Sequence, residues 1–233
     1  MNQETLAFFI YKYTTEDCIL SDIVYPLLNI LSQIHKSHII HRDLKPENIF
    51  IHNGQLFIGD FGYSCILEDD NGTIGTVGTI QYMAPEILSN YIDKTTTTIY
   101  KYEVDIWSIG IIIYELLFHC KPFGWSSYHN ICKTNPTDPE FIKKCLDTPL
   151  EFPHVISEEA KDFLINCLCK NPLERASIEK LLNHPWILNH LKTKKLSNEK
   201  CPLQYDLTQI KNQTIAHSIH SDKKTSKSQC LLS

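Results

Sequence analysis

The 233-residue sequence predicts a mainly α-helical fold that contains one small β-hairpin. Across residues 16–37, apolar side chains recur at the 3, 4, 7 spacing of a largely buried helix. Residues 105–118 are apolar nearly all round, which is typical of a helix at the centre of a helical domain. Between these two segments, two β-rich runs flank Asn53 and Gly54, a pair that favours a tight hairpin turn.

The first helix should end before His38, and Pro26 inside it should kink the helix or mark a late start. The hairpin should pair residues 49–52 with 55–58 and so bring the segments at its two ends together. Residues 63–81 lack apolar periodicity and contain three glycines, so we expect a mobile loop there.

A short polar insertion is expected over residues 90–102, because the segment contains a run of four threonines. A helix is expected over 157–170, with Ser157 as its N-cap and glutamates in its first turn. A last short helix should cover 177–188 and end near His184-Pro185-Trp186. From about residue 191 the chain is rich in Lys, Ser, Asn and Gln, which predicts disorder.

Composition narrows the classes of function. The net charge of −5 gives no reason to expect a nucleic-acid partner. The sequence contains no run of 18 apolar residues, so we expect no transmembrane helix. The N-terminus lacks the basic region of a signal peptide. The nine scattered cysteines indicate reduced thiols and a cytoplasmic location. For Cys167, Cys169 and His184, plain packing is favoured over a metal site.

Three motifs follow one another in the sequence. The first is the run His41-Arg-Asp-Leu-Lys-Pro-Glu-Asn48, and twelve residues after its end comes Asp60-Phe-Gly62. The third is Ala84-Pro-Glu86. In this order and spacing they resemble the catalytic, metal-binding and activation motifs of eukaryotic protein kinases.

The resemblance runs from about residue 3 to 190 and implies a protein-kinase-like C-lobe with a small catalytic β-hairpin. It predicts two regions, a kinase C-lobe over 1–190 and a disordered polar tail over 191–233. Lys45 and the run from Gly78 to Glu86 are similar to the serine/threonine type. The run from Asn171 to Ile187 resembles Aurora-like and calcium-dependent kinases.

The resemblance also implies the roles of individual residues. Asp43 would accept the proton of the substrate hydroxyl, and Lys45 would neutralise charge on the transferred phosphoryl group. Asn48 and Asp60 would hold Mg²⁺ through their oxygens. Glu47 and Phe50 would complete the ATP site, with Phe50 under the adenine. An apolar residue at position 50 is explained equally well by plain packing in the core.

Other residues would support this site. His41 and Phe61 would pack together, and Thr79 would hydrogen-bond near Asp43 and Lys45. Glu86 would pair with Arg175, and Asp105 would have a structural role.

Arg42 lies next to the catalytic Asp43 and suggests that activity is controlled by a phosphorylated loop residue, for which the candidates are Thr73 and Thr76. A single Asp, Asn or Lys in a loop is usually a turn former or solvated surface, so these assignments depend on the joint match.

The sequence contains no G-x-G-x-x-G run and no V-A-I-K strand, the elements that cover and fix ATP phosphates in this family. We therefore expect the N-lobe to be absent and the chain to begin at about the hinge between the lobes. Three interpretations follow: a serine/threonine kinase with an incomplete N-terminus, a C-lobe that acts as a binding module, and a C-lobe whose N-lobe comes from another chain.

The last four residues, Cys230-Leu-Leu-Ser233, match the C-a-a-X pattern for prenylation, with three lysines shortly upstream. A prenyl chain with nearby basic residues would tether the protein to a cytoplasmic membrane face. The alternatives are a chance tail and a cytoplasmic or nuclear protein. A protein substrate and ATP are the other partners that the resemblance implies.

Overall fold

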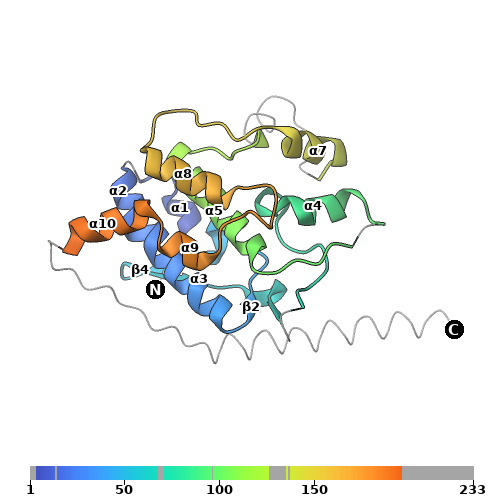
Figure 1. Ribbon diagram of the computed structural model, residues 1–233, viewed down its shortest axis with the longest axis horizontal. Coiled ribbons are helices and arrows are strands. Elements are labelled where there is room, and N and C mark those ends of the chain that lie inside the picture. The colour runs from blue at the N-terminus through green and yellow to red at the C-terminus, as the bar shows by residue number, and fades with distance from the viewer. Residues whose placement is uncertain are drawn as a thin grey trace.

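A computed structural model describes residues 4–13, 15–67, 71–95, 97–125, 135 and 137–195. Helices make up most of this part of the chain, and the strands are short. Most residues of α3 (Tyr25–Lys36) and α5 (Glu103–Phe118) are buried. Figure 1 shows α8 (Glu158–Cys167) along α5 and α9 (Ile178–Leu182) against α3. The fold is mostly helical, as the sequence predicts, and its strands form small sheets.

The predicted helix over 16–37 is present in three consecutive parts. An α-helical turn, α2 (Glu16–Ile19), leads into a π-helical turn at Leu20–Val24 and then into α3. Pro26 lies at the start of α3, where its missing N–H costs least. By length and composition Glu16–Lys36 could cross a membrane, but 61% of its most apolar window is buried inside the protein, which is the pattern of a core helix.

The hairpin has the predicted bounds. Strand β3 (Ile49–His52) pairs antiparallel with β4 (Gln55–Ile58), and Asn53 and Gly54 have left-handed backbone at the turn. Strand β1 (Glu4–Thr5) adds to the other edge of β3. A second small sheet pairs β2 (Ile39–Ile40) with β5 (Cys65–Ile66). Along the chain, β2 of one sheet and β3 of the other therefore flank the segment that contains Asp43.

Helix α5 is the buried axis that its sequence predicts. Every side chain from Val104 to Phe118 is buried, and the helix ends at His119 in a left-handed conformation. The expected helix over 157–170 is α8, which begins after Ser157 as predicted: the Ser157 hydroxyl accepts a hydrogen bond from the amide of Ala160 at 3.1 Å. The end of α8 comes three residues earlier than expected.

The prediction of one helix over 177–188 was wrong. Two helices are present, α9 and α10 (Pro185–Lys195), because Pro185 cannot continue a helix but fits its first turn. Helix α10 also contradicts the expectation of disorder over 191–195. The rest of the predicted tail lies outside the described residues.

Among the described residues, three helices were not expected from the sequence: the short α1 (Leu6–Phe9), α4 (Pro85–Ile92) and α7 (Pro139–Asp147). Figure 1 shows α4 and α7 together at one end of the molecule. The expected loop over 63–81 is mostly irregular, but it includes β5 and a 3₁₀ turn at Ile80–Tyr82. Within the polar insertion, Tyr100 is buried rather than solvated.

Candidate active site

Asp105, in the first turn of α5, fixes the loop that follows β2. Its carboxylate accepts hydrogen bonds from the backbone amides of His41 and Arg42, each at 2.9 Å, and lies 2.9 Å from Nε2 of His35. Burial alone would raise the pKa of Asp105, but His35 and His41 hold it below the ordinary value of 3.8. The loop is therefore attached to the most deeply buried helix through a charged group.

Four of the predicted catalytic side chains lie in one cluster. Oδ1 of Asp43 accepts a hydrogen bond from the Thr79 hydroxyl at 2.7 Å. Its Oδ2 accepts from Nζ of Lys45 at 2.9 Å and from Nδ2 of Asn48 at 3.2 Å. Lys45 also donates to the Thr79 hydroxyl at 3.0 Å. Asp43 is 3% exposed, so the cluster presents a nearly buried carboxylate beside an ammonium group.

The hairpin connects this cluster to Asp60. The amide of Gly59, directly after β4, donates to the carbonyl of Asn48, directly before β3, at 2.9 Å. This hydrogen bond holds Asp60, the next residue, near Asn48. The Asp60 carboxylate is exposed. The ring of Phe50 lies so close to Gly59 that a Cβ there would be 2.6 Å from it. Glu47 is exposed on the 3₁₀ turn Pro46–Asn48.

His41 and Phe61 pack together as expected, with ring centroids 4.8 Å apart. Nε2 of His41 contacts the carbonyl of Gly59 at 3.0 Å, and its Nδ1 accepts from the amide of Asp43 at 3.2 Å. Complete burial lowers the pKa of His41 below its ordinary 6.5, although Asp105 opposes the shift. A neutral ring therefore joins the Asp43 segment to the Asp60 segment.

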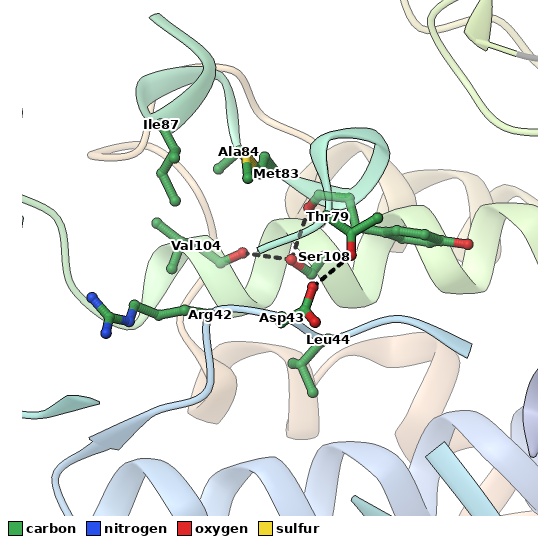
Figure 2. Close-up of a pocket in the computed structure, with 10 residues that line it drawn as sticks. Arg42, Asp43, Leu44, Thr79, Met83, Ala84, Ile87, Val104 and Ser108 are labelled. Atoms are coloured by element: carbon green, nitrogen blue, oxygen red, sulfur yellow. Dashed lines mark hydrogen bonds between the residues drawn. The ribbon is translucent and has the colours of Figure 1, made fainter. Parts of the chain in front are cut away.

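The activation segment reaches the cluster through Gly78, which has a positive φ of 107°. A Cβ on Gly78 would lie 2.3 Å from the carbonyl oxygen of Arg42, so only glycine permits this approach. Figure 2 shows Thr79 beside Asp43 with their hydrogen bond drawn. Around them is a pocket of about 10 Å³, whose apolar lining comes from Leu44, Met83, Ala84, Ile87 and Val104.

One supporting network was missed by the sequence reasoning. The Tyr82 hydroxyl donates to Glu115 at 2.8 Å, and Lys121 donates to the other oxygen of Glu115 at 2.7 Å. Ser108 on α5 donates to the carbonyl of Tyr82 at 2.8 Å. Burial, followed by the charge of Glu115, strongly raises the pKa of Tyr82, so its hydroxyl stays a donor. No local pattern links Tyr82 to Glu115, which lies 33 residues away.

In the part of the chain that the structure describes, no hydrogen bond joins the Arg42 side chain to Thr73 or Thr76. Arg42 donates to the carbonyls of Tyr63 and Ser64 and to the Tyr100 hydroxyl. Thr73 is half-buried, whereas Thr76 is exposed. The prenylation candidate, Cys230, lies outside the described residues.

Glu86 and Arg175 form the predicted buried ion pair. The Arg175 guanidinium donates from Nη1 and Nη2 to the two oxygens of Glu86, at 2.8 and 2.9 Å. The Arg175 side chain is 0% exposed and also lies over the Trp107 ring, 5.1 Å from its centroid. This pair joins the start of α4 to the segment between α8 and α9.

Taken together, the mostly helical fold and the cluster around Asp43 have the arrangement of a protein-kinase-like domain. Residues 1–187 match the family model described as the protein kinase domain. The chain therefore belongs to the eukaryotic protein kinase superfamily, and its relatives are of the serine/threonine type.

Three curated relatives illustrate the similarity. The Aurora kinase of Schizosaccharomyces pombe is 32% identical over 173 residues, which cover 74% of this chain and 44% of the relative. A calcium/calmodulin-dependent protein kinase of Emericella nidulans is 37% identical over 175 residues, which cover 72% of this chain and 40% of the relative. A probable myosin light chain kinase of Dictyostelium discoideum is 34% identical over 205 residues, which cover 86% of this chain and 60% of the relative. The chain thus spans between two fifths and three fifths of these relatives' length.

Proposed function

We propose that the chain supplies the catalytic and substrate-side half of a serine/threonine protein kinase, which transfers the γ-phosphoryl group of ATP to protein hydroxyls. The observation that carries the proposal is the cluster in which Lys45 and Thr79 both contact the Asp43 carboxylate. Membership of the family supports it.

Asp43 has the capacity to bind a substrate hydroxyl in addition to its present partners. An ionised carboxylate offers about four lone-pair sites, and three hydrogen bonds from Lys45, Asn48 and Thr79 use part of them. In the proposed role Asp43 orients the substrate hydroxyl and accepts its proton. Lys45 has three N–H donors, of which two have partners here, so the third would face the phosphoryl oxygens.

The donor atoms fit Mg²⁺. Asn48 uses its amide nitrogen for both hydrogen bonds to Asp43, which leaves Oδ1 for a cation, and the exposed carboxylate of Asp60 provides harder oxygens. Bound Mg²⁺ with ATP would supply charge neutralisation at the phosphates. Phe50 and Glu47 are the residues that we assign to the nucleotide side of the site, with Phe50 offering an apolar surface to the adenine.

The phosphate-covering motifs of the family do not occur in the 233 residues, so we assign that task to residues beyond this sequence. On this view residues 1–190 form the C-lobe portion of the kinase domain. The alternative function is a catalytically inactive interaction module, and the missing phosphate-covering motifs favour it.

The test is phosphoryl transfer by the natural protein isolated from its source cell, with Mg-ATP and a serine- and threonine-containing protein substrate. Asp43→Asn should lower the rate by about 10²–10⁴-fold, because the oriented proton acceptor is lost. The matched control is Asp147→Asn at the exposed end of α7, which should keep full activity. Equal rates in both variants would contradict the proposal, and a wild-type protein without any transfer would favour the interaction module.

The location that we propose follows from composition. A cytoplasmic kinase fits the reduced-thiol composition, and a membrane tether through a prenylated Cys230 stays a prediction. A nuclear location is the other alternative. Each would select a different set of protein substrates.

A further inference from the structure

The segment between α4 and α5 is bonded directly to the activation segment. The amide of Thr73 donates to the carbonyl of Tyr100 at 2.8 Å, and the amide of Tyr100 donates back to the carbonyl of Thr73 at 2.9 Å. Tyr100 is 1% exposed although the preceding threonine tract is polar. A two-residue β-bridge therefore connects two stretches that the sequence alone describes as loops.

The Tyr100 hydroxyl adds a second connection. It donates to the carbonyl of Gly75 at 2.9 Å and accepts from Nη1 of Arg42 at 3.4 Å. Burial raises the pKa of Tyr100, while the Arg42 charge opposes that shift, so the hydroxyl keeps its proton for Gly75. One side chain thus joins the activation segment to the residue next to Asp43.

The Arg42 guanidinium has partners on all three of its nitrogens. Nε donates to the carbonyl of Tyr63, and Nη2 contacts the carbonyl of Ser64 at 3.5 Å. Figure 2 shows that the Arg42 side chain points away from Asp43. A guanidinium in this position would be the partner of an activation-segment phosphate, and here three oxygens of the chain itself, from Tyr63, Ser64 and Tyr100, lie against it.

The close approach of the activation segment to the segment around Tyr100 requires a glycine at position 72. Gly72 has a φ of 78°, and a Cβ on it would lie 2.6 Å from the Ile99 side chain and 3.0 Å from the carbonyl oxygen of Tyr100. A larger residue would push the bridge apart. Thr73 is held inside this contact, and its hydroxyl lies 3.5 Å from Sγ of Cys65. Thr76 is exposed and free of the bridge, so it is the more accessible hydroxyl of the two.

We propose that Tyr100 is a positioning residue that holds the activation segment against Arg42 without a phosphate. Its hydroxyl occupies the place that a phosphate oxygen would take, and the bridge at Thr73 fixes the register of the segment leading to Gly78 and Thr79. The proposal rests on the proposed function for its catalytic meaning, since Thr79 contacts Asp43. Modification of Thr76 would then adjust an ordered segment and not create its order.

The experiment is hydrogen–deuterium exchange of the full chain without nucleotide. In Tyr100→Phe, the amides of residues 73–79 should exchange roughly three- to tenfold faster, the factor that corresponds to the loss of one net hydrogen bond. Exchange in α5 should stay unchanged. The control is Tyr91→Phe on α4, a half-buried tyrosine whose hydroxyl has no hydrogen bond among the described residues.

Two outcomes would overturn the proposal. In the first, exchange over 73–79 is the same in Tyr100→Phe and Tyr91→Phe. In the second, exchange in α5 rises by the same factor as in 73–79, which would show a general loss of packing. Because exchange is measured without phosphoryl transfer, a failure of the proposed kinase activity would not affect this result.

A second variant tests whether the hydroxyl replaces an anion. Thr76→Glu should add little protection over 73–79 in the wild-type background, because Arg42 already has partners. In Tyr100→Phe the same glutamate should restore part of the lost protection. A large gain in protection from Thr76→Glu with Tyr100 intact would contradict the proposal.

Discussion

At the scale of single residues, His41 shows how a buried ring can depend on one protonation state. Its Nδ1 accepts from the amide of Asp43, so the proton of the neutral ring belongs on Nε2, where it faces the carbonyl of Gly59. A second proton would place two donors, the ring N–H and the Asp43 amide, against each other. The neutral form is therefore the one that fits the fold.

This environment predicts a pH dependence of stability. The folded pKa of His41 lies below 6.5, so on acidification the unfolded chain takes up a proton before the folded chain does. The stability that His41 contributes is present above pH 6.5 and is lost as the pH falls from there toward the folded pKa. Denaturant unfolding between pH 7.5 and 5 should show a decline in the free energy of unfolding, and His41→Gln should reduce that decline.

The control is His38→Gln, which removes an exposed imidazole from the same part of the chain. If His41→Gln and wild type lost stability in parallel over this range, the ring would not be kept neutral by the fold.

At the scale of elements, the activation segment lies against the catalytic loop with almost no space between their backbones. Gly78 meets the carbonyl of Arg42, and the hydrogen bond from Thr79 to Asp43 follows one residue later. Ser108 holds the next turn to α5 through the carbonyl of Tyr82. The position of Thr79 therefore depends on backbone contacts on both sides of it.

Two glycines in this segment make a matched pair for testing that contact. Gly78 and Gly75 have similar positive φ angles, 107° and 112°, but a Cβ at Gly75 would meet nothing within 4 Å. Both alanine variants should pay the backbone strain of about 1 kcal/mol or more. Gly78→Ala should lose additional stability through the clash with Arg42, measured as a lower melting temperature than that of Gly75→Ala. Equal melting temperatures would show that the segments can separate freely.

At the scale of the whole molecule, the ion pair of Glu86 and Arg175 connects regions 89 residues apart. Arg175 also donates to the carbonyls of Glu103 and Cys169, so it joins α4, the start of α5 and the end of α8. A guanidinium suits this position because its planar donors satisfy several acceptors at once.

Removal of either Glu86 or Arg175 should therefore lower the free energy of unfolding. Arg175→Ala would leave the Glu86 carboxylate buried without its partner, which typically costs about 3–5 kcal/mol. Chemical denaturation should show a much lower midpoint than for the control Lys143→Ala, whose side chain is exposed on α7. A small and equal effect of both substitutions would contradict a stabilising role for the pair.

The parts of the fold that the sequence predicted are those with local signals. Asn53 and Gly54 marked the hairpin, Ser157 marked the start of α8, and the apolar run to Phe118 marked the buried helix. The expected pair of Glu86 and Arg175 came from the family resemblance, because no local rule links residues so far apart. The same limit explains why the contact from Tyr82 to Glu115 was not foreseen.

Tyr100 and Pro185 show two further reasons for error. The residues before Tyr100 indicated a polar insertion, and no local signal showed that its tyrosine would be buried, because burial of a single tyrosine depends on the segment that packs over it. At Pro185 the sequence was interpreted as the end of a single helix, whereas a second helix, α10, begins there, because a proline that ends one helix also fits the first turn of the next. Both errors arise where tertiary contacts or backbone geometry override local composition.

Arg42 and Asp60 have left-handed backbone, with φ angles of 67° and 57°, although neither is a glycine. Residues with a side chain pay about 1–2 kcal/mol for such a conformation. Glycine would relieve that cost, but it would remove the guanidinium or the carboxylate. Glycine at either position would therefore raise stability only by removing a group that the proposed chemistry needs, so relatives that keep both side chains at this backbone cost would be expected to keep that chemistry.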